Sequence, residues 1–274
     1  MTYLITGSNG QLGTELAKLL PDAILTDRAT LDITDAAAVK KFVHEHNVDT
    51  IINCAAYTAV DAAEDDATTA ENINVIGPRN LAMSGVRIVH ISTDYVFDGK
   101  NYRPYTPDDE TRPMSVYGKT KRAGEIAVLE NARDAIIIRT SWLYSAHGNN
   151  FVKTMRRLGA DRDSLNVVCD QIGSPTFAGD LAAAIVEILP HINETTRGIY
   201  HYSNAGTCSW YDFACAIMEM SGLKCDVNAI PSCEYPTRAT RPFYSVMDTQ
   251  KIQKTFGIKI PHWQRSLKKC IQQF

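Results

Sequence analysis

The strongest constraint on the fold is a glycine triplet close to the start of the chain. The β-rich run Thr2–Thr6 breaks into Gly7, Gly10 and Gly13, and leucines follow at helical spacing over residues 12–20. This order predicts a strand, a tight turn and an amphipathic helix. In dinucleotide-binding folds such a turn lets the backbone approach a pyrophosphate, which the helix N-terminus attracts. A glycine triplet alone also fits a plain tight turn, so the rest of the chain has to support the interpretation.

Further strands and helices alternate along the first half of the chain. Apolar runs predict strands at 23–26, 50–54, 86–92 and 135–140, and helical patterns lie at 35–45, with Thr34 or Asp35 as the cap, and at 68–84. Strands that alternate with helices favour an α/β fold of the Rossmann type, a doubly wound parallel sheet.

The alternation weakens beyond residue 148. Helices are predicted near 151–158, 177–189, 210–221 and 264–272, with short strands around 165–168 and 199–202. We interpret this part as a smaller, irregular substrate-binding domain. The predicted dinucleotide-binding domain covers 1–142, with returning segments near 165–190 and 236–250, and the remainder of 143–274 forms the substrate-binding domain interleaved with it.

Two adjacent charges follow the second predicted strand. Asp27 lies 20 residues after Gly7, where a dinucleotide fold places a carboxylate on the adenosine ribose. Arg28, beside it, could instead pair with the 2′-phosphate of NADP. The choice between NADH and NADPH therefore stays open.

Tyr117 and Lys121 stand four residues apart in the segment MSVYGKTKRAGE. On a helix this spacing places both side chains on one face. A nearby cation favours phenolate, so Lys121 is expected to lower the pKa of Tyr117 and make it a usable proton donor. Such a pair also arises by chance, but here it follows a predicted strand that ends at Thr93, in a chain that opens with a glycine-rich turn.

Candidate ligand-binding residues lie where predicted strands end. Small residues and an aromatic follow residue 54, a hydroxyl and a carboxylate follow residue 92, and a tryptophan follows residue 140. Open α/β sheets bind ligands at this edge. The residues concerned are Ala55, Ala56, Tyr57, Thr93, Asp94 and Trp142. Trp142 could belong to the core, but its place at a strand end favours a substrate contact, and the long loop 97–113 is expected to be functional.

Composition argues against several other classes of protein. The net charge is −3 and no run of Lys or Arg exceeds two residues, which speaks against nucleic-acid binding. No apolar stretch reaches the ~20 residues that cross a bilayer, so we expect no membrane association and a cytoplasmic protein. Seven scattered cysteines and seven scattered histidines give no zinc-site spacing, and no metal site is predicted.

Eight segments resemble, in order and over essentially the whole length, the dTDP-4-dehydrorhamnose reductases, which are extended short-chain dehydrogenase/reductases. The blocks ISTDYVFDG and DQIGSPT are particular to that branch. The segments are TGSNGQLG, NCAAYTAVDAAE, ISTDYVFDG, YGKTKRAGE, RTSWLY, DQIGSPTFAGDLA, GIYHYSNAGTCSWYDFA and RPFYSVMDTQK.

The resemblance implies an NAD(P)H-dependent enzyme that reduces the C4 ketone of dTDP-6-deoxy-L-lyxo-4-hexulose to dTDP-L-rhamnose. It assigns a catalytic triad, residues along the pyrophosphate, the adenine and the nicotinamide side, and contacts to the sugar nucleotide; Tyr57 stands where some relatives carry His. By this resemblance, the catalytic triad consists of Thr93, Tyr117 and Lys121. The pyrophosphate is lined by Gly10, Gln11 and Leu12, the adenine lies near Asp32 and Ile33, and the nicotinamide side is bordered by Ala55, Ala56 and Tyr57. The sugar nucleotide meets Thr93, Asp94 and Trp142.

Other properties stay open at this stage. Some members of the family dimerise around Mg²⁺ held by glutamates and others are monomeric; Glu15 has a suggestive position, but no further ligands can be identified. Asp32 also fits a simple turn. Another nucleotide-sugar 4-reductase or an epimerase is an alternative, as is a non-catalytic regulatory subunit similar to the β subunit of methionine adenosyltransferase.

Overall fold

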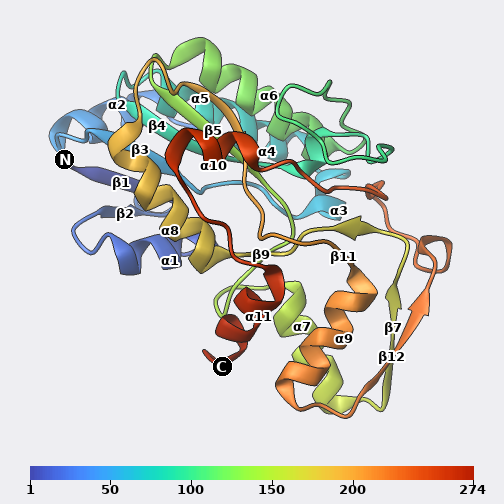
Figure 1. Ribbon diagram of the computed structural model, residues 1–274. Coiled ribbons are helices and arrows are strands. Elements are labelled where there is room, and N and C mark those ends of the chain that lie inside the picture. Colours follow the sequence, from blue (N-terminus) through green and yellow to red (C-terminus); the bar gives the residue numbers. More distant parts are fainter.

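A six-stranded parallel sheet forms the centre of the molecule, which is described here by a computed structural model of residues 1–274 (Figure 1). Its strand order is β10-β5-β4-β3-β1-β2, and every neighbouring pair is parallel. The order places the first strand inside the sheet, so the chain winds outward on both sides of it. The strands are β1 (Tyr3–Thr6), β2 (Ile24–Thr26), β3 (Thr50–Asn53), β4 (Arg87–Thr93), β5 (Ala135–Thr140) and β10 (Gly198–His201).

Helices cover both faces of this sheet. In Figure 1, α2 (Ala36–Glu45), α5 (Gly77–Ala82) and α6 (Val116–Asn131) lie above it, and α1 (Gln11–Leu19) and α8 (Ala178–Ile188) lie below. Successive strand residues alternate between the two cores, since Leu4 packs on the upper side and Ile5 on the lower. Burial on both faces explains why these strands are almost continuously apolar.

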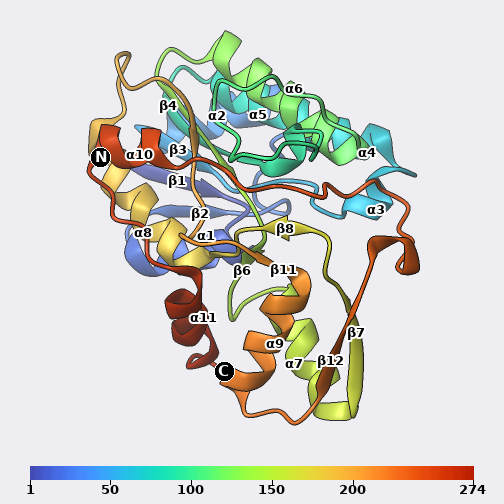
Figure 2. The same cartoon turned by 45° about the vertical axis from the view of Figure 1, so that its right-hand side comes forward.

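A second lobe lies below the sheet in both views and ends near the C-terminus (Figure 2). It has its own core, built around Phe213, Ile217 and Trp263. Its main elements are α7 (Phe151–Asp161), α9 (Trp210–Ser221), α11 (Trp263–Ile271) and the parallel pair β7 (Ser164–Val168) and β12 (Asp226–Ile230).

Short elements complete the chain. The paired strands are β6 (Leu143–Tyr144) with β9 (Thr176–Phe177) and β8 (Ile172–Gly173) with β11 (Cys208–Ser209); the helices and turns are α3 (Val60–Ala63), α4 (Ala67–Glu71), η1 (Asn72–Ile76), η2 (Asp94–Val96), η3 (Leu189–His191), η4 (Ser232–Glu234) and α10 (Gln250–Phe256). None of the helices is both long enough and apolar enough to span a membrane.

The α/β class and the doubly wound parallel sheet are confirmed, with two corrections in the second half of the chain. The segment near 165–168 was expected to return to the dinucleotide-binding domain, but β7 pairs with β12 in the second lobe. The strand predicted around residue 199 was assigned to the smaller domain, but β10 pairs with β5 at the edge of the main sheet. A four-residue strand gives no indication of its partner, because pairing is decided by distant residues. The division of the chain at residue 142 stays a prediction.

The helix predicted over 68–84 is interrupted. It consists of α4, the π-helical turn η1 and α5. Pro78 has no N–H to donate to the carbonyl of Asn74, so the regular ladder cannot continue there. A Cβ on Gly124 of α6 would collide with that carbonyl, which shows how closely the turn packs against α6.

Candidate active site

A cavity of about 400 Å³ opens at the carboxyl ends of β1, β2 and β3. This is the edge of the sheet at which the strand-end residues were expected to bind a ligand. Eight predicted cofactor residues line it, namely Gly7, Gly10, Asp27, Arg28, Asp32, Ile33, Ala55 and Ala56. The structure thus brings together predicted residues from three separate segments of the chain.

The glycine-rich turn is shaped by close approaches of the backbone. Gly7 has φ +65°, and a Cβ there would lie 2.7 Å from the amide nitrogen of Ala55. A Cβ on Gly13 would lie 2.5 Å from the carbonyl oxygen of Gly7. Both positions therefore require glycine, and the turn leaves the backbone bare at the mouth of the cavity.

Gln11 and Leu12 do not line the cavity. Gln11 Oε1 accepts hydrogen bonds from Ser145 Oγ at 3.3 Å and Asn150 Nδ2 at 2.9 Å, which ties α1 to the segment after β6. Leu12 packs into the lower core of the sheet. Only their main chain, at the start of α1, is available to a ligand.

Asp27 is held in a fixed orientation. Its Oδ2 accepts from Asn9 Nδ2 at 2.7 Å and its Oδ1 from the amides of Ala29 and Thr30. Hydrogen bonds from Thr30 lower the pKa of Asp27 below its ordinary value. Arg28 is exposed and makes no ion pair or side-chain hydrogen bond, so its guanidinium is available at the rim of the cavity.

Asp32 and Ile33 form the far wall of the cavity. Asp32 Oδ1 accepts from the amide of Thr34 at 2.9 Å and from its hydroxyl at 2.7 Å, so the carboxylate builds a turn as well as lining the cavity. Ile33 packs against Gly77, where a Cβ would lie 2.5 Å from its side chain.

Tyr57 lies beyond the cavity and is fixed by the side chain of Asn74. Asn74, fully buried on η1, accepts from Tyr57 N at 2.9 Å and donates to Tyr57 O at 3.1 Å. It also donates to Thr120 Oγ1 on α6 at 3.1 Å. Asn74 therefore connects the segment after β3 to the helix that carries Tyr117.

The start of α6 is fixed by side chains from two directions. Ser115 Oγ accepts from Gly118 N at 3.1 Å, and Glu64 Oε1 accepts from Val116 N at 2.8 Å. A Cβ on Gly118 would collide with the carbonyl of Tyr95. This packing brings the Tyr117 ring edge-on to the Tyr95 ring, at 5.5 Å between centroids.

Lys121 is buried and donates to the carbonyl of Ile91, on β4, at 2.6 Å. Two residues further along the same strand, Thr93 donates to Asp94 Oδ1 at 3.0 Å. Burial lowers the pKa of Lys121 to about 8, against a partial increase due to Glu125. The structure thus places Thr93, Tyr117 and Lys121 around the carboxyl end of one strand.

The expected effect of Lys121 on Tyr117 is wrong for this structure. Burial raises the pKa of Tyr117 above its ordinary value, Asp94 and Tyr95 raise it further, and Thr93 partly opposes them. The ammonium of Lys121 is directed at the β4 backbone, and removal of the phenol from water has the larger effect. Tyr117 is therefore protonated at neutral pH.

Asp94 is 2% exposed, and its Oδ2 has no hydrogen-bond partner. Burial raises the pKa of Asp94 to about 6. An unpaired carboxylate oxygen is costly inside a protein, so this one is suited to a polar group that arrives with a ligand.

Trp142 lies where the sheet meets the second lobe. It has φ +48°, a left-handed conformation that is uncommon for a bulky residue. Its ring stacks on Trp210, with 3.6 Å between centroids and 10° between planes, and a Cβ on Gly173 would lie 2.6 Å from it. Both indoles are partly exposed.

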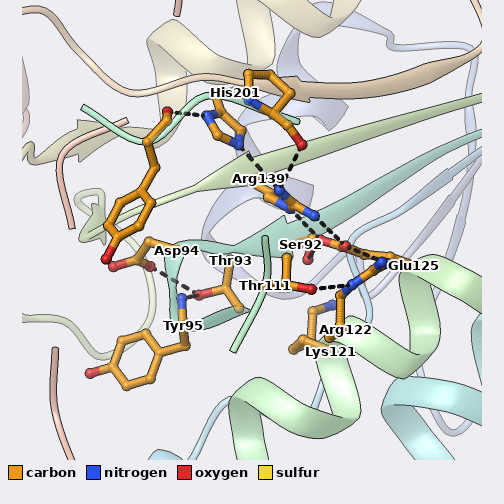
Figure 3. A network of polar contacts seen from close by, with 12 residues as sticks. Ser92, Thr93, Asp94, Tyr95, Thr111, Lys121, Arg122, Glu125, Arg139 and His201 are labelled. Carbon is orange, nitrogen blue, oxygen red and sulfur yellow. Dashed lines mark hydrogen bonds and ion pairs between the residues drawn. The ribbon is translucent and has the colours of Figure 1, made fainter. Parts of the chain in front are cut away.

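A buried polar network behind the site was not predicted (Figure 3). Glu125 accepts from Arg139 through both of its oxygens, each at 2.8 Å, from Ser92 Oγ at 2.6 Å and from Arg122 at 3.2 Å. The only sequence signal is that Glu125 follows Lys121 by four residues. Its partners lie on distant strands, which spacing alone does not reveal.

Glu15, considered for Mg²⁺ binding, pairs with Lys18 at 3.0 Å and lies 3.5 Å from His147 Nε2. No group of three or more His, Cys, Asp or Glu side chains has a geometry suited to a metal ion. These contacts account for Glu15 as part of the join between α1 and the segment after β6.

The parallel sheet, the glycine-shaped cavity at its carboxyl edge and the helix with Tyr117 and Lys121 define a protein with the fold of the extended short-chain dehydrogenase/reductases. The comparisons with known proteins narrow this class. The chain belongs to the family described as RmlD substrate binding domain, whose profile matches residues 1–274.

Relatives match over nearly the full length. A dTDP-4-dehydrorhamnose reductase from Aggregatibacter actinomycetemcomitans is 45% identical, with 97% of this chain and 96% of the relative covered. A reductase of the same name from Clostridium acetobutylicum, known as a crystal structure, has a TM-score of 0.95 at 45% identity, with 100% and 99% covered. Another from Bacillus anthracis, solved in complex with NADP, has a TM-score of 0.95 at 39% identity, with the same coverage.

Proposed function

We propose that this protein is a dTDP-4-dehydrorhamnose reductase that reduces the C4 ketone of dTDP-6-deoxy-L-lyxo-4-hexulose to dTDP-L-rhamnose, with Tyr117 as the proton donor. The observation that carries the proposal is the joint placement of Thr93, Tyr117 and Lys121 around the end of β4. The names of the relatives support the substrate class.

The cavity fits the adenosine and pyrophosphate part of a dinucleotide. At Gly7 and Gly13 any side chain would fill the cradle, which leaves amides at the start of α1 for the pyrophosphate. Asp27 would hold the ribose hydroxyls, or Arg28 a 2′-phosphate, and Asp32 and Ile33 would border the adenine. When bound, NADH or NADPH supplies the hydride for the ketone carbon.

Tyr117 would deliver the proton to the ketone oxygen as negative charge develops there. Its raised pKa keeps the phenol protonated at neutral pH, which is the form that a reduction needs. Thr93 would donate a hydrogen bond to the same oxygen. The protonated ammonium of Lys121, which is held by the carbonyl of Ile91, would bind the nicotinamide ribose.

Asp94 and Trp142 would contact the sugar nucleotide. The unpartnered oxygen of Asp94 is an acceptor for a sugar hydroxyl. Trp142, stacked on Trp210, offers an aromatic surface beside the end of β5 on which a sugar or base can lie. Both residues follow strands whose ends pair in register, Thr93 with Thr140.

The decisive experiment is to incubate the purified protein with NADPH or NADH and the 4-keto sugar nucleotide. We expect oxidation of the cofactor in proportion to substrate, and dTDP-L-rhamnose as the product by NMR. A different C4 epimer, or interconversion of sugar nucleotides without net oxidation, would instead indicate another 4-reductase or an epimerase. Cofactor binding without turnover on any 4-keto sugar nucleotide would favour a regulatory subunit.

A further inference from the structure

Two bonds fix α6 against β4, one turn apart. Tyr117, Lys121 and Glu125 follow one another at intervals of four residues, so they form a row along one face of the helix. Lys121 bonds to Ile91 O and Glu125 bonds to Ser92 Oγ, and Ile91 and Ser92 directly precede Thr93. The helix and the strand are therefore held in register immediately behind the residues proposed to act on the ketone.

Glu125 is the centre of this arrangement. The side chain is fully buried, and Figure 3 shows its carboxylate between Ser92 on β4, Arg139 on β5 and Arg122 on its own helix. Arg139 also donates to the carbonyl of Pro107 at 3.4 Å. Four hydrogen bonds to one carboxylate satisfy its buried lone pairs, and the two-pronged bond to Arg139 fixes its orientation.

Glu125 is also the one negative group among several positive ones. It is surrounded by the cations Arg139, Arg122 and Lys121. The nearby His201 is neutral, because burial and Arg139 lower its pKa to about 3. Glu125 opposes the loss of charge that burial imposes on Lys121. Without the carboxylate, the buried cations Arg139 and Lys121 would have no opposing charge, and the partly exposed Arg122 would add a third positive charge beside them.

We propose that Glu125 is a positioning residue of the reductase site: its bonds to Ser92 and Arg139 hold α6 in register with the sheet, so that Tyr117 and Lys121 face Thr93. This inference rests on the proposed function, because the register of α6 against the sheet affects catalysis only if Thr93, Tyr117 and Lys121 act together. It gives Ser92 and Arg139 a part in catalysis through Glu125, although neither is placed at the ketone.

The groups that face Lys121 determine how its protonation depends on pH. Cys54 and His90 are its other titratable neighbours, and both are neutral, because burial raises the pKa of Cys54 to about 12 and lowers that of His90 well below its usual value. The elements packed on α6 contribute Asp61 from α3, Glu64 directly after α3, Glu71 from α4, Arg79 from α5, and Asp94 and Tyr95 from η2. Of all these groups, Glu125 raises the pKa of Lys121 most, and Cys54 adds a smaller increase.

The first test is Ser92→Ala, which removes one hydroxyl and leaves every charge in place. We expect kcat to fall about tenfold because the helix loses its fixed register, while the KM for NADPH and the pH profile stay unchanged. Ser84→Ala is the control, since it removes a hydroxyl bonded at 2.6 Å to Leu81 O at the far end of α5. It should lower the melting temperature slightly and leave kcat unaltered.

The second test is Glu125→Gln, which keeps the shape of the side chain and an acceptor for Ser92 but removes the charge. Lys121 must be protonated, so a lower pKa ends activity at a lower pH. We expect the basic limb of kcat/KM to move down by roughly one pH unit, a shift that a loss of stability alone would not produce. If this variant does not fold, because Arg139 is left unpaired, Ser92→Ala decides the question.

Tyr117→Phe is assayed in parallel to separate the two proposals. Retained turnover in Tyr117→Phe would contradict the proposed function itself. Lost turnover in Tyr117→Phe, together with unchanged kcat in Ser92→Ala and an unmoved basic limb in Glu125→Gln, would overturn only the positioning role of Glu125. Loss of kcat in Ser92→Ala without loss in Ser84→Ala supports it.

Discussion

The protonation state of a single residue such as Tyr117 depends on its burial and its neighbours in the fold, which the spacing of residues in the sequence does not reveal. The helical spacing of Tyr117 and Lys121 made them candidates, and the structure places both beside Thr93. The direction of the pKa shift of Tyr117 was predicted wrongly, because spacing describes a neighbouring charge but not the removal of the phenol from water. A protonated phenol is nevertheless the form required to donate a proton.

Tyr117→Phe should therefore lose most turnover and keep its cofactor affinity. The change removes one hydroxyl from a helix face that is already packed. General acid catalysis contributes ~10²–10⁴-fold, or about 3–5 kcal/mol of barrier, far more than one peripheral hydrogen bond. Stopped-flow turnover and fluorescence titration with NADPH measure the two quantities. Lys121→Met should impair both, and equal losses of binding and turnover in Tyr117→Phe would argue for a purely structural tyrosine.

Arg28→Ala should change the choice between cofactors. Asp27 is held by Asn9 and Thr30, whereas Arg28 is exposed and unpaired, so its guanidinium is available to a 2′-phosphate. A hydrogen bond to a charged group is worth about 1.5–3 kcal/mol, so the ratio of kcat/KM for NADPH to that for NADH should fall roughly tenfold or more. Lys40→Ala, also exposed, is the control. An unchanged ratio would show that Arg28 makes no such contact.

At the scale of helices and strands, the hydrogen bonds that cap the ends of helices contribute to the free energy of unfolding, and this contribution can be measured. The sequence left Thr34 and Asp35 as alternative caps of α2, and the structure shows that Asp35 Oδ1 accepts from the amides of Ala37 and Ala38 at 2.9 and 3.0 Å. These amides have no partner within the helix.

Asp35→Ala should reduce the free energy of unfolding by about 1 kcal/mol, the usual value of a capping carboxylate. Chemical denaturation followed by circular dichroism measures the change. Asp22→Ala, in an exposed turn before β2, should have almost no effect. A similar small effect in both variants would mean that the cap contributes nothing to stability.

Strands inside the sheet were predicted best, since burial on both faces leaves an almost purely apolar run. The strand Ala135–Thr140 was predicted residue for residue. The strand β12 was missed because it lies at the surface of the second lobe and alternates weakly. The interruption of the helix at η1 was missed because the proline that causes it also fits the first turn of a new helix. Asn74 and Glu125 join elements far apart in sequence, which no local pattern reports.

At the scale of the whole molecule, the site is shared by the sheet and the second lobe. Trp142 follows β5, and its partner Trp210 begins α9. The stacked rings of Trp142 and Trp210 therefore connect the sheet to the second lobe, so a movement of one of these parts would shift a side chain of the other.

Trp142→Ala should raise the KM for the sugar nucleotide far more than that for the cofactor, because the cavity proposed for the dinucleotide lies elsewhere on the sheet edge. Steady-state kinetics with each substrate varied in turn measure both constants. Phe151→Ala, which removes another ring packed on Trp210, is a matched control for the lobe core. An unchanged substrate KM with a large fall in melting temperature would return Trp142 to a structural role.

His201 links global stability to pH. Its pKa is lowered from 6.5 to about 3 by burial and by Arg139, so the unfolded chain binds a proton that the folded protein excludes. The contribution of His201 to the free energy of unfolding is fully present above pH 6.5 and is lost as the pH falls toward 3. His201→Asn, which can keep the bond to Tyr105 O, should weaken this dependence. Urea denaturation from pH 7 to 4 measures the slope, and an unchanged slope would assign acid sensitivity to other groups.

The position of β10 has a consequence for how the protein is made. The strand at one edge of the sheet comes from residues 198–201, whereas its partner β5 is complete at residue 140. During synthesis, some sixty residues must therefore leave the ribosome before β5 can pair on that side. Until then, its apolar edge is open to other nascent chains, and proteins truncated before Gly198 should aggregate although every residue that lines the cavity proposed for the cofactor has already been translated.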